Sequence, residues 1–234
     1  MGLLLLILSA LAGSLVGETL RWEIQFAGVT GGQMWASVVP GVGEAVYIEA
    51  GVRSADWYAR LYPIDDFARS TWTPGQGSSR YETRFREGNF HQDQDMNLSG
   101  DPFTVWRRQA LDEGWREWEK SYPGRTGVQD PVSAIYALRL MSGGGPWTYP
   151  VFSGDKTWPL LVEQVSAEHL KDTPVGAVDV LVLSLHTLHE GDWEQRGRFL
   201  LYLTDDERRI PVRIVVKTSI GSVRANLISY TPPR

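Results

Sequence analysis

Hydrophobic and polar residues alternate along much of this chain, with a period of two. Residues 19–26 alternate in this way, a glycine-containing turn follows at 28–32, and residues 33–39 alternate again. Successive side chains of a β-strand point to opposite faces, so this pattern predicts a hairpin with one buried face. Residues 45–52 and 80–90 have the same pattern and predict further strands with one wet face.

The C-terminal part shows the pattern most clearly, with three strand-like runs between residues 198 and 230. Short turns at 205–208 and 218–221 separate these runs and predict an antiparallel meander. Pro211 lies in the middle run, where it removes a backbone donor. We therefore expect an edge strand or a bulge at that position.

Two segments depart from the simple alternation. Residues 103–122 place several large hydrophobic residues at helical spacing, but Gly114 interrupts them and the flanking runs also alternate. The neighbouring strands favour a hairpin there, and a helix remains the alternative. Residues 130–142 predict a short helix, because Asp130 is a suitable N-cap and Pro131 occupies the first helical position.

Together these elements predict a mostly β fold, an antiparallel sheet curled into a half-open barrel or roll, with one short helix at about residues 130–142. Further strand-like runs at 148–152, 156–165 and 176–186 support this fold class. The chain shows no internal repeat and no linker. Residues 18–234 are therefore predicted to form a single β-rich domain.

The first residues resemble an export signal. The apolar run at residues 3–8 is followed by small residues, and it is far shorter than the roughly 20 apolar residues that a membrane-spanning helix needs. We predict a signal peptide over residues 1–17, for which Ala10 and Ala12 offer an earlier cleavage site and Gly17 a later one. The mature chain is expected in the periplasm or cell envelope of a bacterium, without a transmembrane span. It has no Cys, which excludes disulfides and thiolate chemistry.

Charge and composition narrow the classes of function. The net charge is −5 and no basic patch is present, which argues against nucleic-acid binding because phosphate contacts need clustered Lys and Arg. The chain has 10 Trp residues, which either pack in the core or form platforms for sugar rings. Their irregular spacing favours packing.

No catalytic motif is present, and the candidate clusters have structural explanations. His186 and His189, with Glu190 and Asp192, have a composition that could bind a metal, but residues three apart on a strand face opposite sides. We predict no metal and no cofactor there.

Acidic pairs form a second group of candidates. The pairs at 65–66 and 205–207 could serve as acid and base in glycoside hydrolysis. Asp is, however, common in turns because its side chain bonds the local backbone, and turns are the favoured interpretation at both places.

The predicted helix and the segment after it supply the remaining candidates for ligand or structural contacts, namely Asp130, Tyr136, Arg139 and Trp147. Arg139 could contact a ligand at the mouth of a barrel. It could instead be buried against carboxylates of the sheet, so that it ties the helix to the strands, and this second interpretation is favoured.

Three segments together resemble a known family. The sequences DPVSAIYALR at 130–139, LYLTDDERRIPVRI at 201–214 and GSVRANLISY at 221–230 are similar to the bacterial exported family catalogued as domain of unknown function 3108. The resemblance covers nearly the whole mature chain. It implies an exported, envelope-associated protein with a mostly β fold, and it implies no catalytic residues because the family has no assigned activity.

The leading functional hypothesis is a non-enzymatic envelope protein that binds an apolar or amphiphilic ligand in its curved sheet. One alternative is an envelope assembly or interaction protein without a small ligand, which would expose an aromatic patch of Trp106, Trp115 and Trp118. The third hypothesis is a carbohydrate-active enzyme that uses a carboxylate pair.

Overall fold

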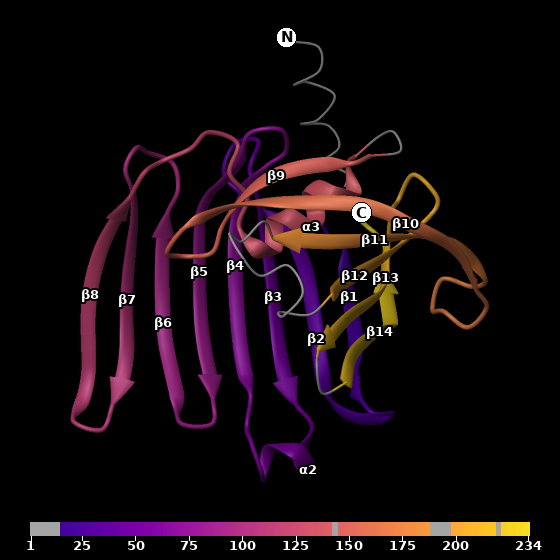
Figure 1. Cartoon of the computed structure of the whole chain (residues 1–234), viewed down its shortest axis with the longest axis horizontal. Coiled ribbons are helices and arrows are strands. Elements are labelled where there is room, and N and C mark those ends of the chain that lie inside the picture. Colours follow the sequence, from indigo (N-terminus) through magenta and orange to yellow (C-terminus); the bar gives the residue numbers. More distant parts are fainter. Residues whose placement is uncertain (1–14, 142–144, 188–197, 219–220) are drawn as a thin grey trace.

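The computed structural model describes residues 15–141, 145–187, 198–218 and 221–234, and these form one sheet of fourteen strands (Figure 1). The first eight strands are β1 (Thr19–Phe26), β2 (Val29–Pro40), β3 (Val46–Ser54), β4 (Asp65–Thr73), β5 (Gly77–Glu87), β6 (Phe90–Asn97), β7 (Phe103–Leu111) and β8 (Gly114–Tyr122). The other six are β9 (Trp147–Phe152), β10 (Thr157–Leu170), β11 (Val178–Thr187), β12 (Arg198–Thr204), β13 (Pro211–Thr218) and β14 (Gly221–Thr231). The helices are α2 (Asp56–Ala59) and α3 (Pro131–Arg139).

The sheet consists of two antiparallel meanders. Strands that follow one another in each meander are paired, and β1 pairs with β14 to join the two halves. The strand order therefore runs from β8 through β1 and β14 to β9, and the sheet is not closed into a barrel. The predicted fold class is confirmed, with α3 as the short helix. That helix ends at Arg139 instead of residue 142, and the four-residue helix α2 is an addition that the pattern did not predict.

The two ends of the sheet approach each other through aromatic contacts. The ring of Phe152 in β9 packs edge-on against Phe103 of β7 and Tyr122 of β8, with ring centroids 5.4 and 5.5 Å away. Gln129, just before α3, donates its backbone N–H to the carbonyl of Pro150 and accepts from the N–H of Phe152, both at 2.8 Å. This segment and α3 therefore lie between β9 and the first meander.

Local chemistry explains where α3 begins. The Asp130 carboxylate accepts the backbone N–H groups of Val132 and Ser133 at 2.8 and 2.9 Å. The Ser133 hydroxyl accepts the backbone N–H of Asp130 at 3.0 Å, which completes a capping box. Pro131 follows at the first helical position, where its missing N–H costs nothing.

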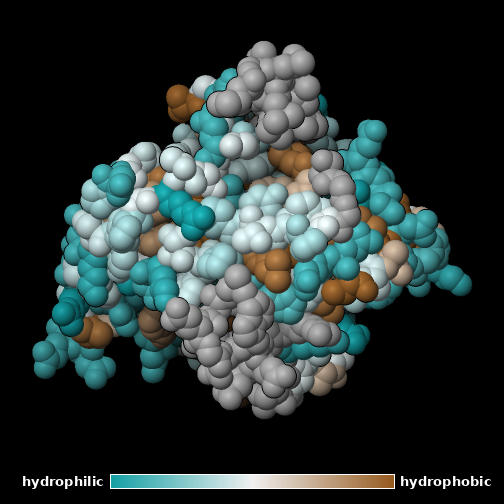
Figure 2. All heavy atoms as spheres, turned by 45° about the horizontal axis from the view of Figure 1, so that its top comes forward, coloured by the Kyte–Doolittle hydropathy of each residue, from teal (hydrophilic) through white to brown (hydrophobic). Residues whose placement is uncertain are grey.

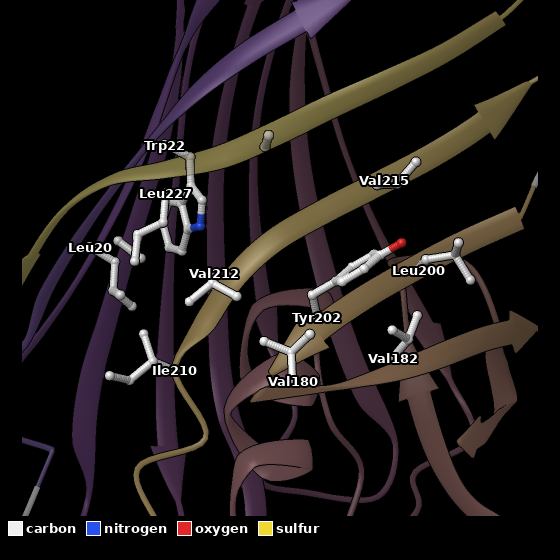
Figure 3. Close-up of a cluster of buried hydrophobic side chains, with 12 residues drawn as sticks. Leu20, Trp22, Val180, Val182, Leu200, Tyr202, Ile210, Val212, Val215 and Leu227 are labelled. Carbon is white, nitrogen blue, oxygen red and sulfur yellow. The ribbon is translucent and has the colours of Figure 1, made fainter. Parts of the chain in front are cut away.

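The hydrophobic core lies on both sides of the C-terminal strands. Val180 and Val182 of β11 face a cluster with residues of β1, β12 and β13 (Figure 3). Leu183 of the same strand belongs to a second cluster with Ala134 and Leu138 of α3. Since β11 is buried on both faces, its sequence is a nearly continuous apolar run and not an alternation.

The open question about residues 103–122 is resolved by β7 and β8. Leu111 pairs with Gly114 across a two-residue turn, so the hairpin is confirmed and the helix is wrong. Gly114 has a φ of 119°, a conformation that residues with a Cβ rarely adopt.

The strands also show the positions of Pro211 and of the pair Asp65 and Asp66. Pro211 is the first residue of β13 and lies at a register shift against β12, which matches the bulge and not the edge strand. The prediction that Asp65 and Asp66 turn the chain is wrong, because both residues begin β4. There, Asp66 accepts the backbone N–H of Arg86 at 2.8 Å.

No helix in the described ranges is both long and apolar enough to cross a membrane.

Candidate functional site

The N-terminus of α3 holds a fully buried carboxylate. Asp130 is 0% exposed, and its second carboxylate oxygen accepts hydroxyl hydrogen bonds from Ser70 of β4 and, at 2.6 Å, from Ser78 of β5. Burial raises the pKa of the Asp130 carboxyl, while these serines and the two helical N–H groups oppose the rise. The arrangement anchors the start of the helix to the sheet.

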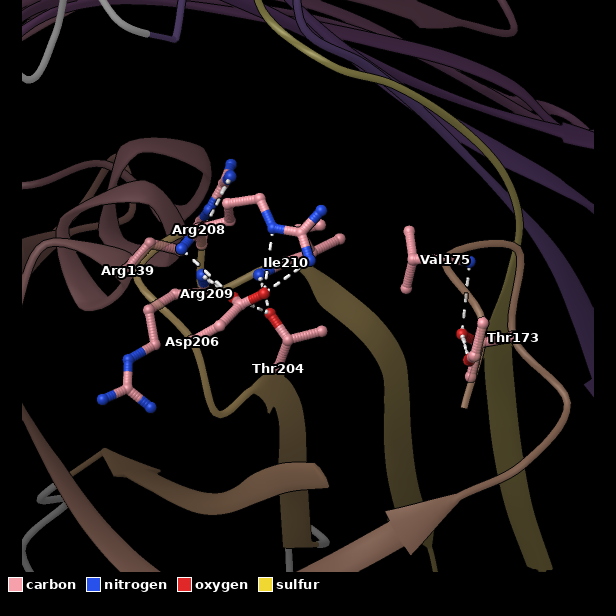
Figure 4. A network of polar contacts seen from close by, with 9 residues as sticks. Arg139, Thr173, Val175, Thr204, Asp206, Arg208, Arg209 and Ile210 are labelled. Carbon is pink, nitrogen blue, oxygen red and sulfur yellow. Dashed lines mark hydrogen bonds and ion pairs between the residues drawn. The ribbon is translucent and has the colours of Figure 1, made fainter. Parts of the chain in front are cut away.

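The C-terminal end of α3 is held by a buried ion pair. Arg139 donates both terminal nitrogens to Glu18, at 2.6 and 2.7 Å, and the two side chains are 2% and 0% exposed. A terminal nitrogen of Arg139 also donates to the backbone carbonyl of Arg208 at 3.2 Å (Figure 4). The guanidinium lies 5.0 Å from the ring centroid of Tyr136. Arg139 thus links the helix to the start of β1 and to the β12–β13 turn.

The acidic turn after β12 is held by a network of polar contacts. Asp206 accepts the hydroxyl of Thr204 at 2.6 Å and the backbone N–H groups of Arg208 and Arg209 at 3.1 and 3.2 Å (Figure 4). Burial opposes ionisation of Asp206, but the bonds from Thr204 and Arg208 outweigh it and lower the pKa of the carboxyl. Asp205 pairs with Arg209 at 3.0 Å on the outside of the turn. The geometry therefore gives this pair a role in the turn and gives no support to acid–base catalysis.

The other sequence candidates are dispersed. His186 lies on β11, where its Nε2 is 2.8 Å from the hydroxyl of Ser184, and His189, Glu190 and Asp192 lie outside the described residues. No group of three potential metal ligands occurs in the parts of the chain that the structure describes. The prediction that this region binds no metal stays a prediction.

The three tryptophans named for the envelope-interaction alternative do not form one patch. In the β7–β8 hairpin, Trp106 pairs with Glu119 and Trp118 pairs with Arg107. Trp106 and Trp115 consequently share one face of the sheet, and Trp118 lies on the other.

A pocket opens at the C-terminal end of α3, and we call it the helix-end pocket. It has a volume of about 390 Å³, within the range that small-molecule sites occupy. Three separate parts of the chain build its wall: the end of β4 with its turn, the two ends of the α3 segment, and β9. The lining residues are Trp72, Gly75, Gly127, Gln129, Ala137, Leu140, Met141, Trp147 and Tyr149.

Of the four candidate contacts, Trp147 lines this pocket and the other three do not. Tyr136 packs behind the wall, with its ring centroid 6.4 Å from that of Trp72. Asp130 and Arg139 hold the two ends of the helix that forms one side of the pocket. Sequence reasoning missed Trp72, Gln129 and Tyr149, because an aromatic residue in an alternating strand has the same pattern whether it fills a core or lines a pocket.

The pocket wall combines aromatic surface with two buried polar atoms. The Nε1 of Trp72 and the Oε1 of Gln129 have no hydrogen-bond partner among the described residues. The side chain of Gln129 is weakly held, since its amide nitrogen donates only to the Gly127 carbonyl, at 3.4 Å. A buried polar group without a partner costs about 1–3 kcal/mol. This wall suits an apolar group that carries one hydrogen-bonding function.

A second hollow, of about 400 Å³, lies between the β1–β2 and β13–β14 turns. Its wall contains Phe26 and Arg224 but no buried polar atom that lacks a partner among the described residues. On the face seen in Figure 2, hydrophobic residues form small separate areas among hydrophilic ones. The helix-end pocket is therefore the better candidate for a specific site.

Comparisons with known proteins concern the fold. The family model described as "Protein of unknown function (DUF3108)" matches residues 21–228. No curated protein matches the chain. A β-barrel-like protein of the domain of unknown function DUF1849 from Brucella abortus is 13% identical, with a TM-score of 0.64 over 93% of this chain and 98% of that one. MucB in complex with MucA(peri) is 11% identical over 98% of both chains, but its TM-score of 0.20 carries no argument. The similarity to the DUF1849 protein shows a shared fold alone.

Proposed function

Since this chain belongs to the family of unknown function DUF3108, we propose its role from its own geometry: it is an exported, non-enzymatic protein of the bacterial cell envelope that binds a small apolar or amphiphilic ligand in the helix-end pocket. The signal-like N-terminus, the absence of Cys and the β-rich fold support the compartment. The pocket, with its aromatic wall and two unpartnered polar atoms, carries the proposal for the ligand.

The size of the ligand follows from what fills the curve of the sheet. α3 lies against β3, β4 and β9, and buried clusters occupy the space on both sides of it. The hollow that a large lipid would need is therefore packed with side chains. The remaining pocket accommodates an aromatic ring system or a short alkyl group next to Trp72 and Trp147, with a polar function towards Gln129.

Filling the pocket from the helix is expected to abolish binding. The probe is N-phenyl-1-naphthylamine, an uncharged aromatic amine whose fluorescence rises in apolar surroundings. Ala137 lines the pocket from α3 and is only partly buried, so Ala137→Phe places a ring in the cavity. We expect Trp147→Ala, which removes one aromatic wall, to weaken binding about tenfold, which corresponds to about 1.4 kcal/mol.

A matched control is available on the neighbouring strand. Trp158 lies on β10 and does not line the pocket, so Trp158→Ala should leave the affinity for the probe within about twofold. Equal binding by the wild type and Ala137→Phe, or no binding by the wild type, would contradict the proposal.

The export part of the proposal predicts where the leader is removed. Leu15 is 8% exposed in a core cluster with Trp72 and Tyr136. The Gly17 N–H donates to the Val38 carbonyl at 2.8 Å. Cleavage after Gly17 would remove these contacts, whereas cleavage after Ala12 keeps them.

When the full chain is produced in a Gram-negative host, we therefore expect the periplasmic fraction to contain a protein that begins before Leu15, and not at Glu18 as a signal peptide over residues 1–17 would give. Intact-mass measurement decides the point. A mature chain that begins at Glu18 would contradict the earlier cleavage site, and an unprocessed protein confined to the cytoplasm would contradict export itself.

A further inference from the structure

Exposed hydrophobic residues are concentrated at one end of the first meander. Eleven large hydrophobic side chains are exposed among the described residues, and eight of them lie at the turns of four hairpins, β1–β2, β3–β4, β5–β6 and β7–β8. In a meander, every second turn lies at the same end of the sheet, and these four turns form the lower edge in Figure 1. We call this edge the hairpin rim; it consists of Phe26, Val29, Trp57, Leu61, Tyr62, Phe90, Leu111 and Trp115.

The rim is held in place by contacts between neighbouring turns. The indole N–H of Trp57 donates to the carbonyl of Thr30 at 2.9 Å, which joins the second hairpin end to the first. The N–H of Gly88 donates to the carbonyl of Pro63 at 2.8 Å, which joins the third to the second. A Cβ at Gly88 would lie 2.7 Å from the Tyr62 ring, so the ring rests directly on that turn. These side chains are exposed on an ordered frame, and little ordering is left to oppose binding.

The spacing of the hydrophobic side chains along the rim favours a lipid bilayer over a protein as its binding partner. Neighbouring strands are about 4.8 Å apart, so successive tips are roughly 10 Å apart and the row is on the order of 30 Å long. Charged residues such as Asp56, Glu87 and Asp112 stand between the hydrophobic tips. A protein interface needs a continuous packed centre, whereas Trp, Tyr and Leu on separate tips can each enter the headgroup region of a bilayer.

The balance of charged residues near the rim indicates which kind of lipid it would bind. Basic residues near the tips, such as Arg53, Arg60 and Arg86, are matched or outnumbered by acidic ones, which include Asp65 and Glu113. Without a basic excess, electrostatic attraction to anionic lipids is absent. We propose that the hairpin rim docks the protein on the interface of a zwitterionic bilayer, with the eight hydrophobic side chains of its four tips inserted at headgroup depth.

The experiment compares two triple variants by flotation with vesicles of phosphatidylethanolamine and phosphatidylcholine. The rim variant is Leu61→Ser, Phe90→Ser and Leu111→Ser, with side chains 78%, 40% and 51% exposed. The control is Val42→Ser, Val165→Ser and Ile228→Ser, which removes the three exposed hydrophobic residues outside the rim, at 81%, 53% and 46%. We expect the rim variant to lose at least tenfold in vesicle partitioning, while the control stays within twofold of the wild type.

Tryptophan fluorescence reports how deeply the rim enters the bilayer. Trp57 and Trp115 remain in the rim variant and the control, and in the wild type brominated phosphatidylcholine should quench their fluorescence. All proteins should unfold at the same temperature, since the changed side chains are exposed.

The proposal is overturned if the wild type does not float, if both triple variants lose binding equally, if only anionic vesicles bind, or if the rim crosslinks to an envelope protein without binding vesicles. Ala137→Phe should float like the wild type, so failure of the rim and failure of the pocket are distinguishable.

Discussion

Replacing Glu18 with alanine is expected to lower the free energy of unfolding by about 3–5 kcal/mol, because it leaves the Arg139 guanidinium buried without its counter-charge. Both side chains are almost completely excluded from solvent, and the pair is bidentate. The remaining contact of Arg139 with the Arg208 carbonyl, at 3.2 Å, cannot neutralise the charge. Urea unfolding at pH 7, followed by far-ultraviolet circular dichroism, measures the loss. A domain of this kind has roughly 5–15 kcal/mol in total, so the variant should unfold at much lower urea.

Two comparisons separate the buried charge from the loss of side-chain bulk. Glu18→Met combined with Arg139→Met removes both charges and should recover most of the stability, since well-packed apolar pairs often replace buried ion pairs without loss. Asp65→Ala breaks the exposed Arg53–Asp65 pair, whose side chains are 74% and 54% exposed, and should cost less than about 1 kcal/mol. If Glu18→Ala cost no more than Asp65→Ala, the pair would not hold the helix as described.

This ion pair shows what the sequence could and could not predict. The spacing of the helix favoured Arg139 as a buried tie to the sheet, and the structure places it against a carboxylate. The partner, Glu18, is 121 residues away in the chain, and no local pattern specifies such a pairing. Glu18 also follows directly on the predicted leader, where sequence reasoning found no candidate.

Local patterns predicted the elements that depend on local chemistry. Alternation found most strands of both meanders, although not β4 or β6, and the N-cap found the helix, because both signals lie within a few residues. The turn before β4 was misjudged for the same reason. Asp65 and Asp66 have the composition of a turn, but pairing with Arg53 and Val52 of β3 places them in a strand. The helix α2 has no side-chain cap at its N-cap, so no signal marked it.

The candidate sites depend on contacts between distant segments. The helix-end pocket joins β4, α3 and β9, and neither Trp72 nor Gln129 differs in sequence from an ordinary core or loop residue. The hairpin rim did leave a signal, since Leu61 and Leu111 stand at turns where polar residues are usual. Its meaning depends on the meander, which places those turns at one end of the sheet.

Replacing Asp130 with alanine is expected to lower the free energy of unfolding by about 3 kcal/mol or more. The loss of the N-cap contributes about 0.5–2 kcal/mol. The hydroxyls of Ser70 and Ser78 lose their shared acceptor while they remain buried, and each such group costs about 1–3 kcal/mol. Thermal and urea unfolding measure the total.

The conservative variant Asp130→Asn tests whether hydrogen bonding or charge is responsible. Burial raises the pKa of Asp130, so the charge is held at a cost and a neutral amide should be tolerated. Its oxygen can still accept the N–H groups of Val132 and Ser133, and the two serine hydroxyls can rotate to accept from its nitrogen. We expect Asp130→Asn to cost about 1 kcal/mol. A loss as large as that of Asp130→Ala would mean that the carboxylate charge itself holds α3 on the sheet, and that the helix and the pocket at its other end are positioned electrostatically.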